Sequence, residues 1–262
     1  MALRRFTSLF ILSYLLCSIG SSSLVSAQNV SLALYYESLC PYSANFIVNG
    51  LAKIFESGLV DIVDLKLVPY GNARIGSDGT SITCQHGPYE CLLNTVEACA
   101  LNAWPDLDTH FRFIYCIESL VMEGTYRHWP SCFKKSGLES KPITDCTGSG
   151  LGKKLELKYA AETNALQPPH KYVPWVVVDG QPLYEEYMNF ISYVCAAYKG
   201  TAVVKACKEL LLQTVTEVKS DRTPQVSFAD QSSTSPFAAT GAAKITSQAS
   251  SGWHQVKMAA SK

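Results

Sequence analysis

One cysteine stands where an apolar, strand-forming run ends and an amphipathic helix begins, and this junction constrains the possible fold more than any other feature. The run Val30 to Tyr36 is β-prone, and Cys40-Pro41-Tyr42-Ser43 follows it. Apolar residues then recur at helical spacing: Ala44, Ile47, Val48, Leu51, Ile54 and Phe55. Pro41 suits the first helical position, where its missing N–H costs nothing. The sequence therefore predicts a strand, a turn and a helix that extends to about Ser57.

The place of Cys40 at the amino end of this helix predicts a reactive thiol. Free backbone N–H groups and the helix dipole favour a thiolate there, and such sites lower a cysteine pKa from about 8.5 to roughly 3.5 to 7.5. The alternative is a buried cysteine that merely caps the helix. Ser43 occupies the position where a redox dithiol would carry its second sulfur. The tetrapeptide alone leaves both interpretations open.

The amino-terminal residues 1–27 predict a secretory signal peptide. Basic residues precede an apolar run from about Phe6 to Ile19, and a small, polar segment follows it. The run is shorter than the about 20 apolar residues of a membrane span, so we expect cleavage before Gln28 rather than an uncleaved anchor, and no membrane span afterwards. We expect a secreted, extracellular protein or one of the lysosomal or vacuolar lumen. Asn29 begins a glycosylation sequon, Asn29-Val30-Ser31, that is consistent with this route.

The cysteine count predicts one free thiol and four disulfides. The chain has ten cysteines, and nine remain when Cys17 is removed with the signal peptide. If Cys40 is free, the other eight can pair in an oxidising compartment, and 105 pairings are possible. These structural cysteines are Cys84, Cys91, Cys99, Cys116, Cys132, Cys146, Cys195 and Cys207. A zinc site of Cys84, His86, Cys91 and Cys99 is the alternative, but the paired spacings of structural zinc sites are absent, and we expect no metal.

The charge pattern excludes two classes of partner. The formal net charge is +0 at pH 7, and lysine and arginine are scattered along the chain. Nucleic-acid binding and anionic membrane binding both need clustered basic residues, so we expect neither partner.

Residues 28–218 read as one α/β domain with a helical insertion. An alternating strand over Leu59–Val68 ends in the turn Tyr70-Gly71-Asn72-Ala73. From about 84 to 165 the pattern indicates short helices between proline-containing breaks, with most of the cysteines among them. We interpret this part as a disulfide-rich, mainly helical insertion.

A proline introduces the last strand of the pattern. Val173-Pro174-Trp175-Val176-Val177-Val178 precedes an Asp-Gly turn, and an aromatic-rich amphipathic helix follows over 182–198. Residues 200–218 predict one more helix. From 219 to 262 the chain is rich in serine, threonine, alanine and glutamine, so we expect a disordered tail.

This order of elements resembles the thioredoxin-like fold. In that fold the residue that matches Pro174 is cis and faces the reactive cysteine. A cis proline exposes the carbonyl and N–H of Val173, which can pair with an extended substrate segment and hold its disulfide against Cys40. The alternative is an ordinary trans proline at the start of a strand.

The segment Cys84-Gln85-His86-Gly87-Pro88-Tyr89-Glu90-Cys91-Leu92-Leu93-Asn94-Thr95-Val96-Glu97-Ala98-Cys99 resembles the signature of the gamma-interferon-inducible lysosomal thiol reductase family. The resemblance extends to Tyr35 to Pro41, Val68 to Ala73 and Val173 to Val176, and it spans roughly Val30 to Tyr198. It implies a thioredoxin-like domain that reduces disulfides of protein substrates in endosomal or lysosomal compartments or after secretion. Cys40 matches the attacking cysteine.

Ser43 departs from the Cys-x-x-Cys pair of this family. In a dithiol enzyme the second sulfur resolves the mixed disulfide, and well-oriented intramolecular reactions reach effective molarities of about 10⁵ to 10⁸ M. The Ser43 hydroxyl can only donate a hydrogen bond to the Cys40 thiolate, so we expect turnover to need an external small-molecule thiol and no other cofactor. The alternative function is a non-catalytic, disulfide-stabilised binding protein that has lost reductase turnover.

Side chains beside the thiol and the proline complete the predicted site. We expect Tyr42 and Trp175 to form an apolar platform for substrate next to Val173, and core packing is the alternative for both. An imidazolium at His86 would lower the pKa of Cys40. We instead expect His86 to be a structural hydrogen-bonding residue of the turn between Cys84 and Cys91.

Overall fold

The computed structural model describes residues 29–213 and 227–228. The predicted signal peptide and most of the predicted tail therefore lie outside the described residues. Asn29–Tyr198 and the described residues from Val203 onward form one compact unit, whereas Lys199–Ala202 belong to a second unit. All helices and strands of the described chain lie in the first unit.

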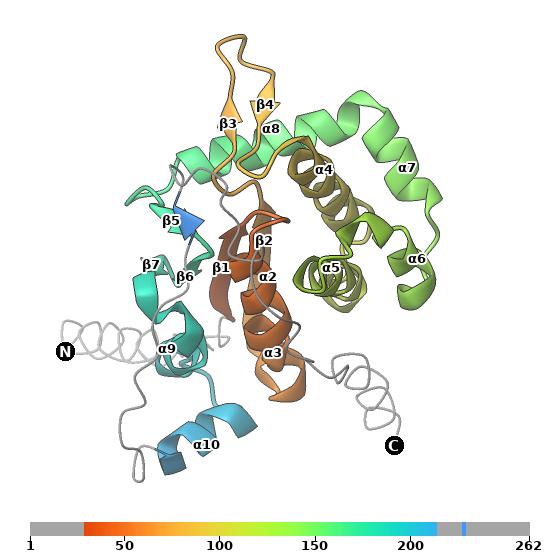
Figure 1. Ribbon diagram of the computed structural model, residues 1–262. Helices are drawn as coiled ribbons and strands as arrows, with labels where there is room; N and C mark the ends of the chain where they lie inside the picture. Colours follow the sequence, from red (N-terminus) through yellow and green to blue (C-terminus); the bar gives the residue numbers. More distant parts are fainter. Residues whose placement is uncertain (1–28, 214–226, 229–262) are drawn as a thin grey trace, which may run out of the picture. The chain divides into compact units, whose positions relative to one another are not determined.

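A four-stranded sheet with the order β2-β1-β6-β7 positions the site. β1 (Val30–Tyr36) pairs in parallel with β2 (Val63–Pro69) along its whole length. β6 (Trp175–Val178) lies antiparallel on the other side of β1, and β7 (Gln181–Pro182) pairs antiparallel with β6. A parallel pair joined by a helix and followed by an antiparallel hairpin is the thioredoxin-like arrangement. The predicted fold class is confirmed (Figure 1).

The helix after β1 is confirmed, but its middle is wound differently. It consists of α2 (Pro41–Asn45), the π-helical segment η1 (Phe46–Leu51) and α3 (Lys53–Glu56). Its apolar positions face the core: Phe46, Ile47, Leu51 and Ile54 are fully buried. The next predicted strand begins later than expected, because Leu59–Asp61 form a 3-10 turn (η2) before β2 starts.

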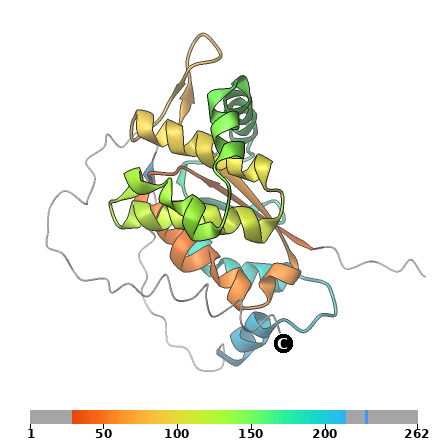
Figure 2. The ribbon, with the colours of Figure 1, turned by 90° about the vertical axis from the view of Figure 1, so that its right-hand side faces the viewer.

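The predicted helical insertion is confirmed between β2 and the last hairpin. A short hairpin of β3 (Arg74–Ile75) and β4 (Ile82–Thr83) precedes it. The elements that follow are α4 (Pro88–Ala103), α5 (Leu107–Met122), the 3-10 turn η3 (Tyr126–His128), α6 (Ser131–Ser136), α7 (Lys141–Gly148) and α8 (Gly150–Asn164). α4 packs beside β2, and α5 packs beside α2 (Figures 1 and 2). The insertion therefore lies against β2, the parallel neighbour of β1, and against α2, the helix that begins after Cys40.

Disulfides staple this insertion and the last helices. Within the described chain the bonds are Cys84–Cys91, Cys99–Cys146, Cys116–Cys132 and Cys195–Cys207, and Cys40 is free. The predicted division into eight paired cysteines and one free thiol is confirmed. A native disulfide typically contributes about 2 to 4 kcal/mol, which matters for helices as short as α6 and α7.

The carboxyl-terminal part of the domain ends in short elements. β5 (Tyr172–Val173) precedes Pro174 and β6, and the predicted helix over 182–198 consists of a 3-10 segment, η4 (Tyr184–Asn189), and α9 (Phe190–Ala197). α10 (Lys205–Gln213) follows. Ser227–Phe228 lie within the predicted disordered tail and form a strand, β8, which pairs with β5. Among the helices of the described residues, none has the length and apolar character of a membrane span.

Candidate active site

Cys40 and Pro174 lie at the same end of the sheet. Cys40 follows the carboxyl end of β1, and Pro174 precedes the amino end of β6. Tyr35 pairs with Trp175 in the antiparallel register, so both ends meet. The Val173-Pro174 peptide bond is cis, which confirms that prediction. The topology thus places at one end of the sheet two residues that lie more than half of the chain apart in the sequence.

The Cys40 thiol is buried and held in its neutral form. Cys40 has an extended backbone at the start of α2, and its carbonyl accepts a hydrogen bond from the Ala44 N–H at 3.0 Å. Its side chain is 0% exposed. Burial, followed by repulsion from the Glu37 carboxylate, raises the pKa of Cys40 to about 12. This corrects the predicted low pKa, because desolvation of the sulfur outweighs the helix terminus.

Ser43 acts on the sulfur in the opposite direction. Its backbone N–H and hydroxyl, together with the Tyr42 N–H, favour the thiolate and lower the pKa of Cys40. Ser43 is fully buried, and its Oγ has no nitrogen or oxygen hydrogen-bond partner within the described residues. The hydroxyl therefore has no stronger acceptor competing with the sulfur.

The two predicted platform residues differ in exposure. Tyr42 is partly exposed beside Cys40. Trp175 is 1% exposed, and its ring lies 5.4 Å, centroid to centroid, from the rings of both Tyr172 and Tyr184. This corrects the predicted platform role of Trp175, since the side chain fills the core. Val173 is also buried, and its backbone is paired in β5.

A buried carboxyl, Glu37, lies three residues before the thiol, and sequence reasoning missed it. Its Oε2 accepts a hydrogen bond from the Asn72 N–H at 2.8 Å, and its Oε1 lies 3.4 Å from Nδ1 of His86. Burial, and then repulsion from Glu90, raises the pKa of Glu37 well above its ordinary value. Gly71 makes room for it: a Cβ there would lie 2.6 Å from Cβ and Oε2 of Glu37.

The family-like signature holds the loop that leads from β1 to Cys40. Glu90, Asn94 and Glu97 recur at helical spacing and form one face of α4. The Ser38 N–H donates to Oδ1 of Asn94 at 2.9 Å, and the Ser38 hydroxyl donates to the Glu90 carbonyl at 3.2 Å. The Tyr36 hydroxyl donates to Oε2 of Glu97 at 2.6 Å. The helical spacing of these polar residues was the sequence signal that could have indicated that they contact one common segment, the loop before Cys40.

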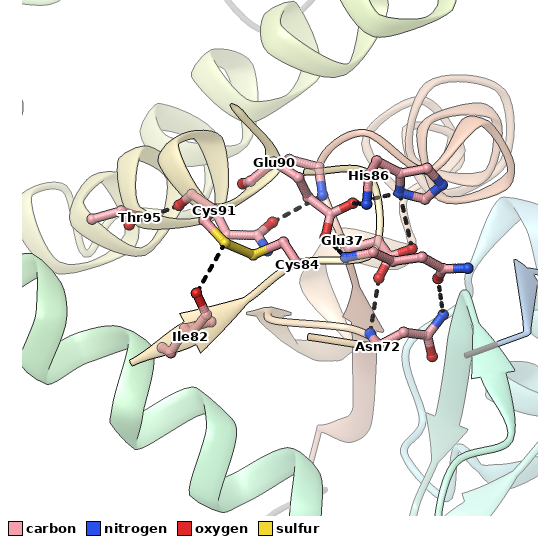
Figure 3. The surroundings of a disulfide bond; sticks show 11 residues. Glu37, Asn72, Ile82, Cys84, His86, Glu90, Cys91 and Thr95 are labelled. Carbon is pink, nitrogen blue, oxygen red and sulfur yellow. Dashed lines mark hydrogen bonds and ion pairs between the residues drawn. A yellow bond between two sulfur atoms is a disulfide. The ribbon is translucent and has the colours of Figure 1, made fainter. Parts of the chain in front are cut away.

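The turn closed by Cys84–Cys91 aims a histidine at the same loop (Figure 3). The N–H groups of Gln85 and His86 donate to the Glu90 carboxylate, and Nδ1 of His86 makes a short contact with the same group. Nδ1 also faces Glu37. The structural hydrogen-bonding role predicted for His86 is confirmed, and His86 also contacts Glu37, which lies three residues before Cys40.

Besides Glu37 and Glu90, α4 and α5 carry another pair of buried acidic residues. Glu97 of α4 and Glu118 of α5 are both 0% exposed. Burial raises the pKa of Glu97 to about 7 and the pKa of Glu118 well above its ordinary value. Two adjacent buried carboxyls are stable when one carries a proton and donates it to the other. Ionised Glu97 and Cys40 both disfavour the charged form of Glu118.

One group among the described residues has the composition of a metal site. Glu37, His86 and Glu90 each offer a ligand atom, and these atoms lie within 4.8 Å of one another. His86 contacts both carboxylates, but Oε1 of Glu37 makes no hydrogen bond within the described residues. The alternative zinc site is excluded, because Cys84, Cys91 and Cys99 are bound in disulfides. A cavity of about 420 Å³ lies between α3, α9 and α10, away from this group.

Comparison with known proteins gives consistent matches. Residues 31–136 match the family described as "Gamma interferon inducible lysosomal thiol reductase (GILT)". The chain is 46% identical over 207 residues to the gamma-interferon-responsive lysosomal thiol protein of Arabidopsis thaliana, which covers 77% of this chain and 86% of that protein. It is 36% identical over 198 residues to the gamma-interferon-inducible lysosomal thiol reductase of Mus musculus, covering 74% and 78%. A solved disulfide bond oxidoreductase (DsbG) from Mycobacterium tuberculosis superposes with a TM-score of 0.46 at 18% identity, covering 72% and 86%.

Proposed function

Because this chain belongs to the gamma-interferon-inducible lysosomal thiol reductase family, we propose that it is a thiol–disulfide oxidoreductase that attacks protein disulfides through the single thiol of Cys40. The observation that carries the proposal is the state of the cysteines. Within residues 29–213, Cys40 is the one free cysteine, and it stands at the amino end of α2 at the sheet end where Pro174 lies.

The reaction begins as a thiol–disulfide exchange. The Cys40 sulfur attacks one sulfur of a substrate disulfide, and a new S–S bond joins Cys40 to the substrate. The other substrate sulfur leaves as a thiolate and takes up the proton that Cys40 released. The product is a mixed disulfide with one free thiol on the substrate.

Release of the mixed disulfide needs a thiol from outside the site. The other eight cysteines of the described chain are paired, and Ser43 carries no sulfur. A small-molecule thiol attacks the substrate sulfur and frees Cys40, and a second one completes the reduction, so two small thiols are oxidised to one disulfide. If a different thiol of the substrate attacks that sulfur instead, a new disulfide forms within the substrate, Cys40 is freed, and the outcome is isomerisation.

Protonation of Glu37 removes one of the two causes that disfavour the Cys40 thiolate. A Cys40 thiolate is disfavoured by burial and then by the charge of Glu37. The pKa of Glu37 is itself raised well above its ordinary value, so in an acidic lumen its carboxyl is neutral and that repulsion is absent. The Ser43 N–H and hydroxyl favour the thiolate. Substrate approach must also open the cover over the sulfur.

The substrate is a disulfide-containing protein held by its main chain. Val173, directly before Pro174, offers its backbone carbonyl and N–H to an extended segment, and such strand addition supplies affinity without a demand on sequence. Tyr42 is partly exposed next to Cys40 and can contact the same segment. The Trp175 ring is buried and makes no contact with this segment in the proposed binding mode.

The chain follows the secretory route to a lysosomal, vacuolar or extracellular destination. Four disulfides within the described residues form and persist in oxidising compartments. Asn29, the sequon residue, is exposed at the start of β1. Amino-terminal sequencing of the mature protein should begin at Gln28, and an N-glycosidase should shift its mass.

A non-catalytic binding protein is the second candidate, and the burial of Cys40 favours it. A thiol with 0% exposure and a pKa of about 12 is a poor nucleophile unless substrate binding uncovers it. In this alternative the scaffold stabilised by disulfides would hold partners without turnover.

One assay separates the two functions. The full chain is incubated with a protein substrate linked by a disulfide and with a small thiol, and thiol release is followed for the wild type, Cys40→Ala and Cys40→Ser. Turnover that depends on the small thiol and disappears in both variants supports the oxidoreductase. An adduct that no thiol releases, or a rate indifferent to Cys40, supports the binding protein.

A further inference from the structure

Strand β5 carries the backbone edge next to Pro174, and another segment of the same chain is paired with it. β5 comprises Tyr172 and Val173, and β8 comprises Ser227 and Phe228. The two strands are antiparallel, with Tyr172 opposite Phe228 and Val173 opposite Ser227. They form a two-stranded sheet of their own, separate from the four-stranded sheet (Figure 1).

We propose that the edge of β5 binds extended polypeptide, and that Ser227–Phe228 is its intramolecular occupant, which competes with the substrate. This inference rests on the proposed function, because it concerns the edge on which the substrate segment is placed. Antiparallel pairing through the main chain is the interaction that an added strand makes at an exposed edge. The chain supplies such a strand itself.

The occupant blocks the edge but cannot take part in the chemistry. Val173 lies at the end of the sheet where Cys40 begins α2, so a strand paired with Val173 occupies the edge on which an extended substrate segment would pair. The segment 223–232, Thr-Pro-Gln-Val-Ser-Phe-Ala-Asp-Gln-Ser, contains no cysteine. It therefore offers Cys40 no sulfur to attack and behaves as an unreactive substrate mimic.

The strength of this pairing suits displacement. A two-residue ladder includes few backbone hydrogen bonds, and each contributes roughly 2- to 12-fold to an equilibrium. Tethering on the same chain places the segment at an effective concentration in the millimolar range, so even weak pairing keeps the edge occupied. A substrate that pairs over more residues displaces the segment, whereas a substrate without an extended stretch gains nothing from the edge.

A matched pair of variants of the full chain tests the competition. Ser227→Pro with Phe228→Pro removes both backbone N–H groups, whereas Ser227→Ala with Phe228→Ala keeps them. With an unfolded disulfide-linked polypeptide as substrate, the proline variant should lower KM roughly 2- to 10-fold at unchanged kcat, and the alanine variant should match the wild type. With cystine as substrate, all three should have the same KM.

A binding measurement tests the same edge without any chemistry at Cys40. A fluorescently labelled peptide of residues 223–232 is titrated with the wild type and with the proline variant, and its anisotropy is followed. Binding that is stronger to the proline variant supports the proposal even if no variant turns over substrate. Equal binding to both proteins, or binding to neither, overturns it even where thiol-dependent turnover has supported the proposed function.

Discussion

Acidification from pH 7 to pH 4.5 should stabilise the folded chain through the buried acid pair of Glu97 and Glu118. Burial raises the pKa of Glu97 from 4.5 to about 7, and it raises the pKa of Glu118 in the same direction. In the unfolded chain both carboxyls regain their ordinary pKa. Between these two pH values the folded state therefore keeps protons that the unfolded state has lost.

The sign and size of the effect follow from this difference. When the folded state binds more protons, the free energy of unfolding falls as the pH rises. The stabilisation is fully present below pH 4.5 and is lost as the pH rises through the folded pKa of about 7. One pKa unit corresponds to about 1.4 kcal/mol, so the whole shift of Glu97 is worth about 3 to 4 kcal/mol. About 2 to 3 kcal/mol of this stabilisation is lost between pH 4.5 and pH 7, and Glu118 adds to it. Domains are stable by only about 5 to 15 kcal/mol in total.

The measurement is chemical unfolding of the full chain with its disulfides intact, at several pH values between 4.5 and 7. The wild type is compared with the double variant Glu97→Gln, Glu118→Gln, in which the amide carbonyl at position 97 can still accept the Tyr36 hydroxyl. His110 and His170 have pKa values lowered by burial and contribute the opposite slope. They are present in both proteins, so their contribution cancels in the difference.

An exposed carboxyl provides the control. Glu139→Gln removes one charge from the surface and should leave the slope of stability against pH unchanged. If the wild type and the double variant lose stability in parallel between pH 4.5 and 7, then burial does not hold a proton on this pair, and the reasoning fails. A pH dependence of stability that is smaller in Glu139→Gln than in the wild type would place part of the titration on the surface.

Three further substitutions test the site. Ser43→Cys should supply a second sulfur that resolves the mixed disulfide within the site, so a thiol titration should show that reduction needs much less small thiol. An unchanged need for small thiol would show that the serine at position 43 does not limit turnover. Glu37→Gln should lower the pKa of Cys40, measured as alkylation rate against pH above neutrality, because a repelling charge is lost; an unaltered profile would contradict this. Gly71→Ala should lower the free energy of unfolding by about 2 kcal/mol more than Gly79→Ala. Both glycines have positive φ, but only at Gly71 would a Cβ meet Glu37, and equal losses would refute the clash.

The features that the sequence predicted correctly depend on local pattern. Alternation and helical spacing placed β1 and the helix at Cys40, because the side chains of one face must share one environment. The predicted mature chain has an odd number of cysteines, which predicted one free thiol beside eight paired cysteines, and the free Cys40 bears this out. The cis bond before Pro174 came from the resemblance rather than from local pattern.

The features that the sequence did not reveal depend on tertiary burial. A helix amino end predicts a low pKa for Cys40, but the pKa depends on how much water reaches the sulfur, and packing decides that. Glu37 reads as a surface residue until Gly71 and the Asn72 N–H enclose it. Two residues of a polar tail, Ser227–Phe228, form a strand only because the edge of β5 is there to pair with them.

The insertion explains why the most recognisable part of this sequence lies so far along the chain from its thiol. Between the end of β1 and Cys40 the chain leaves the sheet, so sheet pairing alone does not fix where the sulfur stands. Asn94 and Glu97 of α4 hold the backbone and side chains on either side of Glu37, and His86 faces Glu37 itself. Each of these contacts is buried or half-buried, where an unmade hydrogen bond costs about 1 to 3 kcal/mol. The signature residues that make these contacts therefore hold the segment that leads to Cys40, and they do so whether position 43 carries a sulfur or a hydroxyl.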